Sequence, residues 1–419
     1  SCGLASSRLS ANSVYCSAAT TEAATAALPA ADETQGGFQA YAAAQDLVKA
    51  TEEAFKAAGR KPSYLVTMSL QASVEAGKDT FDIEAPGSHK LAFSSRLDDD
   101  DMPVLGAALQ AVASCLSRLD LSCNLLTDAG AQTLASTLLS RATRLTSLSL
   151  RSNSIGPKGC AAVCEALRAC PELRELDFAF NPLGREGGMC VVNFLRSSPN
   201  LLQLRLHDCE ADIDAVIGVA EALLGTDMQL QVCNIENPRI QTLQEEHTVH
   251  LGRMLRVNAN LTELSLGKIK MRDEGVRQLV SFLIENKTLR KLDLRCNELR
   301  SDGAKHLAIL LEQDCQLSAL DVSSNSLGHM SNVDGAKAIA RALTCNRMLQ
   351  ELSLDRNSLC GEALQAIADA IDQNSTLKLI TLYHNAWDVA SSQKFQEIVA
   401  DRTRITELKS MGVAPGVRH

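Results

Sequence analysis

Apolar and polar positions follow two different periods within one short unit, clearest in the stretch that begins at Leu289 and reads LRKLDLRCNELRSDGAKHLAILLEQDCQ. Its leucines before Asn297 lie two or three residues apart, which favours a short extended strand followed by a turn. Gly303, Leu307 and Leu311 then recur at helical spacing. Neither half can bury its apolar face alone, so each unit needs a neighbouring copy on both sides.

The pattern LxxLxLxxN recurs through most of the chain and predicts a solenoid. One position, which we call the ladder position, repeats every 28 to 32 residues, at Asn124, Asn153, Asn181, Cys209, Pro238, Ile269, Asn297, Asn325, Asn357 and Asn385. Ten units of this period are typical of the ribonuclease-inhibitor subclass of leucine-rich repeats. We therefore predict an α/β leucine-rich repeat solenoid, a horseshoe with parallel strands on the concave side and helices on the convex side. Strand-helix units are expected from about Leu116 to Ala400.

Four regions are predicted along the chain: a disordered tail at 1–36, an N-terminal cap at 37–96, the repeat array at 97–408 and a C-terminal tail at 409–419. The first is rich in Ala, Ser and Thr and cannot form a core. Arg8 is its one basic residue, which disfavours an organelle transit peptide.

The cap is predicted to be a helix over 37–60 that ends at Gly59, because alanine favours helix and glycine follows the last turn. Tyr64 to Leu70 is interpreted as a degenerate first strand, followed by an irregular connection to Ser95.

Asparagine recurs at the ladder position because its side-chain amide can both donate to and accept from backbone groups inside the solenoid. Cys209 is an accepted substitute, whereas Pro238 and Ile269 can supply no such bonds. The ladder is therefore predicted to be interrupted in the middle of the protein. A second irregularity is expected after Leu327, where four extra residues are predicted to bulge as a loop.

Composition and charge favour a protein partner. Hydrophobic residues make up 45% of the chain and charged residues 22%, and no apolar run approaches the roughly 20 residues that cross a bilayer. The formal net charge of −9 disfavours binding to nucleic acid or to an anionic membrane. We expect no cofactor and no small-molecule substrate.

The fourteen cysteines are interpreted as reduced thiols in an intracellular chain, because no secretory signal peptide is recognisable. Several occupy repeated positions, including Cys123, Cys209, Cys233 and Cys296, where cysteine is expected to be a small buried hydrophobe.

Three groups of residues could carry chemistry. Asp98 to Asp101 could bind a cation, but four acids before Met102 and Pro103 are better explained by a helix N-terminus. His247 and His250 could share a metal ion, but no HExxH pattern completes such a site.

Aspartates recur in one strand slot at Asp120, Asp177, Asp293 and Asp321, and adjacent copies would lie about 5 Å apart in register. Paired carboxylates can perform acid and base work. However, Asp is common in this strand pattern, no nucleophile accompanies it, and the chain has no GxxxxGK[ST] nucleotide loop. We therefore expect no enzyme and no metal site.

A segment that breaks the repeat carries a family resemblance. It contains NIENP from Asn234, QEE from Gln244 and VHLGRML from Val249, and an entry segment nearer the N-terminus has Asp99 to Asp101 before Val104 and Leu105. Together with the order of the flanking repeats, these residues resemble the leucine-rich repeat-containing protein 34 family over roughly 97–400. The resemblance implies a non-catalytic cytoplasmic protein of ciliated organisms, attached to axonemal structures such as radial spokes; a nucleolar location is less favoured.

Two other functions compete with a protein-binding scaffold. Activating proteins of Ran-like small GTPases use the same repeat subclass, but this chain lacks an acidic tail and a recognisable catalytic segment. The array could also be the repeat portion of a larger sensor protein.

The concave face is the predicted binding surface, formed by side chains that alternate with the leucines. The predicted residues are Arg205, His207, Asp208, Glu236, Glu263, Lys268, Lys291, Arg295, Asp355, Arg356, Tyr383 and His384. Residues 251–310 hold twelve Lys or Arg against seven Asp or Glu, which would steer an acidic partner to this zone. The alternative is that these charges only solvate a curved surface, while contacts lie on the helices or at the ends.

Overall fold

The computed structural model describes residues 38–76, 79–90, 96–225, 227–240, 243–313, 315–400 and 407–409, all within one compact unit that spans Gly37–His419. The tail predicted at 1–36 and nearly all of the tail predicted at 409–419 lie outside these residues.

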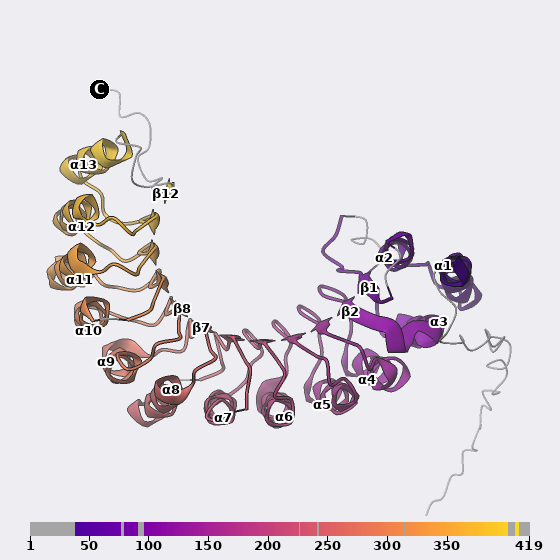
Figure 1. The fold of residues 1–419 in the computed structure, drawn as a ribbon. Coiled ribbons are helices and arrows are strands. Elements are labelled where there is room, and N and C mark those ends of the chain that lie inside the picture. Colours follow the sequence, from indigo (N-terminus) through magenta and orange to yellow (C-terminus); the bar gives the residue numbers. More distant parts are fainter. Residues whose placement is uncertain are drawn as a thin grey trace, which may run out of the picture. The chain divides into compact units, whose positions relative to one another are not determined.

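Within the described residues the strands form one twelve-stranded parallel sheet, in which each strand pairs with the next along the chain (Figure 1). The strands are β1 (Phe81–Glu84), β2 (Leu116–Asp120), β3 (Ser147–Ser149), β4 (Glu175–Asp177), β5 (Gln203–Arg205), β6 (Val232–Asn234), β7 (Glu263–Ser265), β8 (Lys291–Asp293), β9 (Ala319–Asp321), β10 (Glu351–Ser353), β11 (Leu379–Thr381) and β12 (Glu407–Lys409). From β2 to β12 their register is constant, so that Leu292 of β8 pairs with Leu320 of β9, whereas the pairing of β1 with β2 shifts by one residue after Phe81.

From β1 onward one α-helix lies between each strand and the next, and these helices cover the convex side of the sheet in Figure 1, whereas the first two helices precede β1. The helices are α1 (Phe38–Ala57), α2 (Tyr64–Glu75), α3 (Asp101–Leu109), α4 (Asp128–Thr137), α5 (Pro157–Ala166), α6 (Gly184–Arg196), α7 (Ile213–Ala222), α8 (Glu245–Val257), α9 (Arg272–Leu283), α10 (Ser301–Glu312), α11 (Asp334–Cys345), α12 (Gly361–Gln373) and α13 (Val389–Ala400). The predicted fold class and the array from Leu116 to Ala400 are confirmed.

The N-terminal cap confirms one prediction and corrects another. Helix α1 ends before Gly59, whose φ of +68° lies in the left-handed region that glycine tolerates. Tyr64 to Leu70, by contrast, belongs to α2 and not to a strand: Leu65, Val66 and Leu70 are buried on one helical face. The first strand is instead β1, inside the segment predicted to be irregular.

Strand β1 escaped prediction because it offers little apolar signal. Its one fully buried side chain is Ile83, which stands between the outward residues Asp82 and Glu84. These two pair in register with Arg118 and Asp120 of β2. The sheet therefore begins one strand earlier than the repeat pattern indicates.

The asparagine ladder is present as predicted. The amide of Asn153 donates to the carbonyl oxygens of Leu121 and Leu150, at 3.0 and 2.9 Å, and its oxygen accepts from the N–H of Leu126 at 3.1 Å. Each such side chain thus joins its own turn to that of the preceding unit. The residue before every one of the ten ladder positions has a positive φ, which bends the chain out of the strand.

The predicted interruption of the ladder changes the backbone hydrogen bonds around it. The thiol of Cys209 still donates a hydrogen bond to the Phe178 carbonyl at 3.0 Å. Pro238 and Ile269, at the next two ladder positions, have no side-chain group that can donate or accept one. Leu183 N–H and Ile240 N–H then bond to carbonyls only two residues back, at 2.8 and 2.9 Å. A tight local turn therefore replaces the bond to the following unit.

We predict that backbone amides in 230–270 exchange with solvent faster than those in 290–330, because two consecutive units there lack the side-chain bonds that couple neighbours. Hydrogen exchange followed by mass spectrometry measures this difference directly. Equal protection of the two segments would contradict the prediction; the 290–330 segment is a matched control because its ladder asparagines are complete.

A second asparagine ladder lies at the C-terminal ends of the helices and was not predicted. Its members are buried and donate to a carbonyl of the preceding helix, as Asn346 does to Leu311 at 2.8 Å and Asn374 to Leu343 at 2.7 Å. Asn258 and Asn286 make equivalent bonds to Leu223 and Leu255. An NxxL pattern just before each following strand is the sequence signal that identifies these residues.

Two smaller predictions have different outcomes. The extra residues after Leu327 form a local 3-10 turn, His329–Ser331, which confirms a loop there. Cys209 and Cys233 are buried as expected, but Cys123 and Cys296 are only half-buried, because they occupy the left-handed turn before a ladder asparagine.

Candidate protein-binding surface

The candidate binding surface is the face of the sheet opposite the helices (Figure 1). Along each of the strands β1 to β11 a buried residue stands between two more exposed ones, as Leu292 does between Lys291 and Asp293. The residue two positions before each ladder position continues this outward set, since side chains alternate along a strand. Three sets of outward side chains therefore run across the sheet: those just before the buried strand residue, those just after it, and those two positions before the ladder position. We call these three sets the inner rows.

Most of the predicted binding residues lie in the inner rows, namely Arg205, His207, Glu236, Glu263, Lys291, Arg295, Asp355 and Tyr383. The others precede a ladder position and have positive φ; they are Asp208, Lys268, Arg356 and His384. Contrary to the prediction, these four residues do not alternate with the buried leucines. They lie in the turns that border the face, which we call the rim.

Carboxylates outnumber cations in the inner rows of β1 to β11. The eleven carboxylates are Asp82, Glu84, Asp120, Glu175, Asp177, Glu236, Glu263, Asp293, Asp321, Glu351 and Asp355, and the five cations are Arg118, Arg151, Arg205, Lys291 and Arg295. The excess of positive charge in residues 251–310 had predicted a basic concave face that attracts an acidic partner. The inner rows instead carry more negative than positive side chains, so this prediction is corrected.

The cations of that zone are largely engaged within the chain. Lys291 Nζ lies 2.7 Å from Glu263 Oε1, and Arg295 Nε lies 3.1 Å from Asp293 Oδ2. Lys268, by contrast, has no ion-pair partner among the residues that the structure describes. The charge count over residues 251–310 combined side chains of the strand, the rim and the helix, which face different directions.

An ion pair between a half-exposed arginine and a buried carboxylate crosses one whole unit of the face. Arg295 Nη2 donates to both oxygens of Glu236, at 2.9 and 2.8 Å, although the two residues belong to units that are not adjacent. Glu236 is only 5% exposed. The unit between them contributes Gly267, where a Cβ atom would lie 3.1 Å from both Arg295 Cγ and Glu236 Oε2. The missing side chain therefore makes room for the bridge.

A similar contact crosses the unit of Ala179. Arg151 Nη1 lies 3.1 Å from His207 Nε2, and its guanidinium carbon lies 4.7 Å from the centre of the Phe180 ring. The imidazole meets the same ring edge-on at 5.1 Å. Burial, reinforced by the neighbouring guanidinium, lowers the pKa of His207. The contact therefore favours neutral imidazole.

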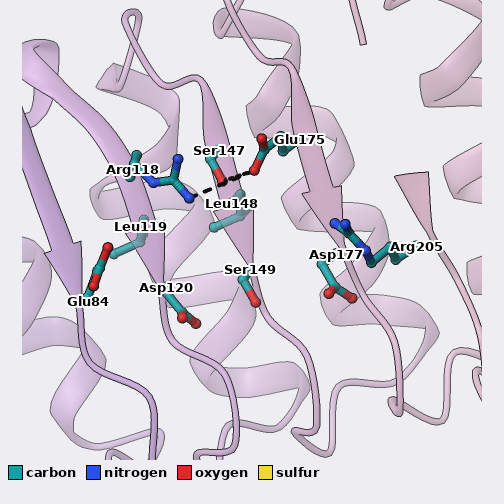
Figure 2. A pocket seen from close by; sticks show the side chains of 10 residues that line it. All are labelled: Glu84, Arg118, Leu119, Asp120, Ser147, Leu148, Ser149, Glu175, Asp177 and Arg205. Carbon is teal, nitrogen blue, oxygen red and sulfur yellow. Dashed lines mark hydrogen bonds and ion pairs between the residues drawn. The ribbon is translucent and has the colours of Figure 1, made fainter. Parts of the chain in front are cut away.

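Two shallow hollows lie in the sheet face, one on each side of β6. Figure 2 shows the first, over β1 to β5, where Arg118 and Ser147 both contact Glu175. Asp177 lines it, and burial raises the pKa of this carboxyl. Of the predicted binding residues, Arg205 alone lines this hollow, although the same positions in earlier units would have identified the others.

The second hollow lies over β7 to β11 and is lined by Glu263, Lys291, Asp293, Asp321 and Glu351, among others. Burial, with the neighbouring Asp321 carboxylate adding to it, raises the pKa of Asp293 to about 6. These two aspartates pair in register, as the strand pattern predicted. Glu263 and Asp293 are paired with Lys291 and Arg295, but the other two carboxylates of this hollow have no ion-pair partner among the described residues, so a cationic group from outside would be favoured there.

The remaining inner-row contacts are local. Arg205 Nη2 donates to Gln203 at 2.9 Å, and the Asp355 carboxylate accepts from the Tyr383 backbone N–H at 2.7 Å. Arg356 and His384 are exposed on the rim.

The residues considered for metal binding have other roles. His247 Nδ1 accepts from the Gln244 N–H at the start of α8. Of the acids before Met102, Asp98 and Asp101 bind the Arg60 guanidinium, which fastens the N-terminal cap to α3. Among the described residues, no three His, Cys, Asp or Glu side chains are grouped to hold a metal ion.

None of the described helices is long and apolar enough to cross a membrane.

Similar proteins share the repeat. A family model described as Leucine Rich repeat matches residues 112–135, 142–164, 169–192 and 285–308. Ribonuclease inhibitor of Sus scrofa is 28% identical over 309 residues, which cover 74% of this chain and 52% of that protein.

Leucine-rich repeat-containing protein 34 is similar too. The Mus musculus protein is 32% identical over 194 residues, covering 46% of each chain. The Homo sapiens protein is 36% identical over 166 residues, covering 40% of this chain and 35% of its own. The chain thus spans about half or less of the length of the curated relatives it matches. With its strand-helix units in register along one parallel sheet, the chain is a leucine-rich repeat solenoid, similar to ribonuclease inhibitor and to leucine-rich repeat-containing protein 34.

Proposed function

We propose that the protein is a non-catalytic scaffold that binds a protein partner on the inner rows, and that basic side chains of the partner enter the two hollows. The observation that carries the proposal is the sheet face with its eleven carboxylates against five cations. Complementary charge steers association and selects partners. The repeat relatives support a binding role, since one of them is named for inhibiting a ribonuclease.

The size of the hollows favours side chains over metabolites. Their cavity volumes are about 120 and 230 Å³, below the roughly 300–1,000 Å³ typical of small-molecule sites. A lysine or arginine side chain can enter such a space and meet the carboxylates of the second hollow, among them Asp321 and Glu351.

We further propose that the partner belongs to the ciliary axoneme, with radial spokes as the first structures to test, and that the protein is cytoplasmic. The support is the resemblance of residues 234–255 to leucine-rich repeat-containing protein 34. Affinity purification with the full chain as bait, from isolated cilia and from cell bodies in parallel, tests this location. Recovery of the same partners from cell bodies alone would refute it.

The binding surface itself is tested with purified partner. Changing Asp321→Asn together with Glu351→Gln should weaken binding by about tenfold, because two carboxylates that face the entering cation become neutral. The matched control, Glu285→Gln with Glu397→Gln, removes two exposed charges from the helix side. Affinity should stay within about twofold of wild type there.

Equal losses in the two variants would show that net charge, and not the inner rows, governs association. Stimulated GTP hydrolysis by a Ran-like GTPase in a single-turnover assay would instead support the GTPase-regulator alternative. A full-length protein with an additional nucleotide-binding domain would support the sensor alternative.

A further inference from the structure

Basic side chains gather on the rim beside the interrupted ladder. Lys268, Lys270 and Arg272 follow β7 as alternate residues, with φ of 55°, 54° and 59°. Arg239 occupies the rim of the preceding unit, and Arg300 is the equivalent of Arg272 in the following unit. We call these five residues the rim patch.

Contacts between units make the rim patch continuous. Lys270 Nζ donates to the Ile240 carbonyl at 3.1 Å, directly beside Arg239. Arg272 Nε contacts Glu298 of the following unit at 2.9 Å, two residues before Arg300. Three neighbouring units therefore contribute to a single surface.

Three acids lie near the rim patch, and two of them pair with its cations. Glu298 is engaged by Arg272, and the Asp273 carboxylate accepts the backbone N–H groups of Arg300 and Gly303 at 2.7 and 3.0 Å. Arg239 is 80% exposed at its side chain and reaches Glu210 only at 3.7 Å.

The two free cations complete the patch. Lys268 and Arg300 are exposed and have no ion-pair partner within the described ranges. Of the five cations, Arg239 and Arg272 have an acidic partner and the other three have none among the described residues, beside inner rows in which carboxylates predominate.

We propose that the rim patch is a second binding surface and that it takes a short protein segment rich in Asp and Glu. Charge complementarity selects this occupant. A polyanion with a long footprint, such as nucleic acid, or an anionic membrane would also cover the carboxylates of the neighbouring inner rows, which repel it. A short acidic segment can stay on the rim. The surface differs from the inner rows, so this inference is independent of the proposed partner there.

Fluorescence anisotropy with the full chain tests the inference. The labelled ligand is a ten-residue oligoglutamate peptide, measured at about 50, 150 and 300 mM NaCl, where screening grows. The rim variant carries Arg239→Glu, Lys268→Glu and Arg300→Glu. The matched control carries Lys158→Glu, Arg253→Glu and Arg347→Glu, three exposed cations on or next to the helices, and so has the same net charge.

Wild type should bind the peptide with an affinity that falls as salt rises, the rim variant about tenfold or more weakly, and the control within about threefold of wild type. Circular dichroism should be the same for all three proteins. Equal weakening by the control would overturn the proposal, as would absence of binding at the lowest salt. Tighter binding of a ten-nucleotide oligothymidylate or of phosphatidylserine vesicles than of the peptide would also overturn it.

Discussion

Replacing Asn297 by leucine should lower the free energy of unfolding by about 2–3 kcal/mol, because three buried backbone groups lose a partner at once. The amide of Asn297, which is fully buried, donates to the Leu266 carbonyl at 2.8 Å. Its oxygen accepts from the N–H groups of Ile269 and Met271, each at 3.2 Å. Leucine has a similar volume but neither donates nor accepts hydrogen bonds. The expected loss of stability therefore comes from hydrogen bonding more than from packing.

Urea denaturation followed by circular dichroism measures this loss. Asn385→Leu is the matched control: Asn385 makes the same kinds of bond, but it is only half-buried, so that water can replace them. Its cost should be about 1 kcal/mol. An unchanged denaturation midpoint for Asn297→Leu would contradict a stabilising role of the ladder.

Arg295→Ala should destabilise the protein by about 2 kcal/mol, because it leaves the Glu236 carboxylate buried without its cation. The value lies below the usual cost of breaking a buried pair, since the Arg295 side chain is 43% exposed and water can enter. Glu236→Gln should cost less, because the amide keeps the hydrogen bond from Asn234 or Arg295 while removing the buried charge.

A double-mutant cycle separates pairing from other effects. Adding Glu236→Gln to Arg295→Ala should restore about 1 kcal/mol, because no uncompensated buried charge remains. Simple additivity of the two changes in chemical denaturation would show that the pair is not coupled. Lys291→Ala, which breaks an exposed pair with Glu263, provides the comparison and should cost less than about 1 kcal/mol.

The sequence predicted the solenoid well because its two periods are local and repeated. Leu292 and Leu320 recur 28 residues apart, and a constant period leaves one possible register for parallel strands. The same arithmetic located the ladder and the outward residues of the strands. It failed at Tyr64 to Leu70, where apolar residues are dense and neither period stands out over so short a stretch.

The candidate surface was predicted less well, because charge along a chain is not charge on a face. Lys268 and Lys291 appear in one window of sequence, but the first lies in a left-handed turn on the rim and the second on a strand beside Glu263. The Arg295–Glu236 bridge depends on the missing side chain of Gly267 between them, which becomes visible only once three units are stacked.

The bridges of the inner face change how far a local disturbance can travel through the solenoid. The three units without a ladder asparagine contribute His207, Glu236 and Gly267 to one row, and arginines from outside that region, Arg151 and Arg295, hold the first two. In a repeat protein with purely nearest-neighbour coupling, a weak unit would divide the array into halves that melt separately. Here each arginine contacts a side chain two units away, so coupling between units extends beyond nearest neighbours in the segment that lacks ladder asparagines. The two halves are thereby expected to share a single thermal transition.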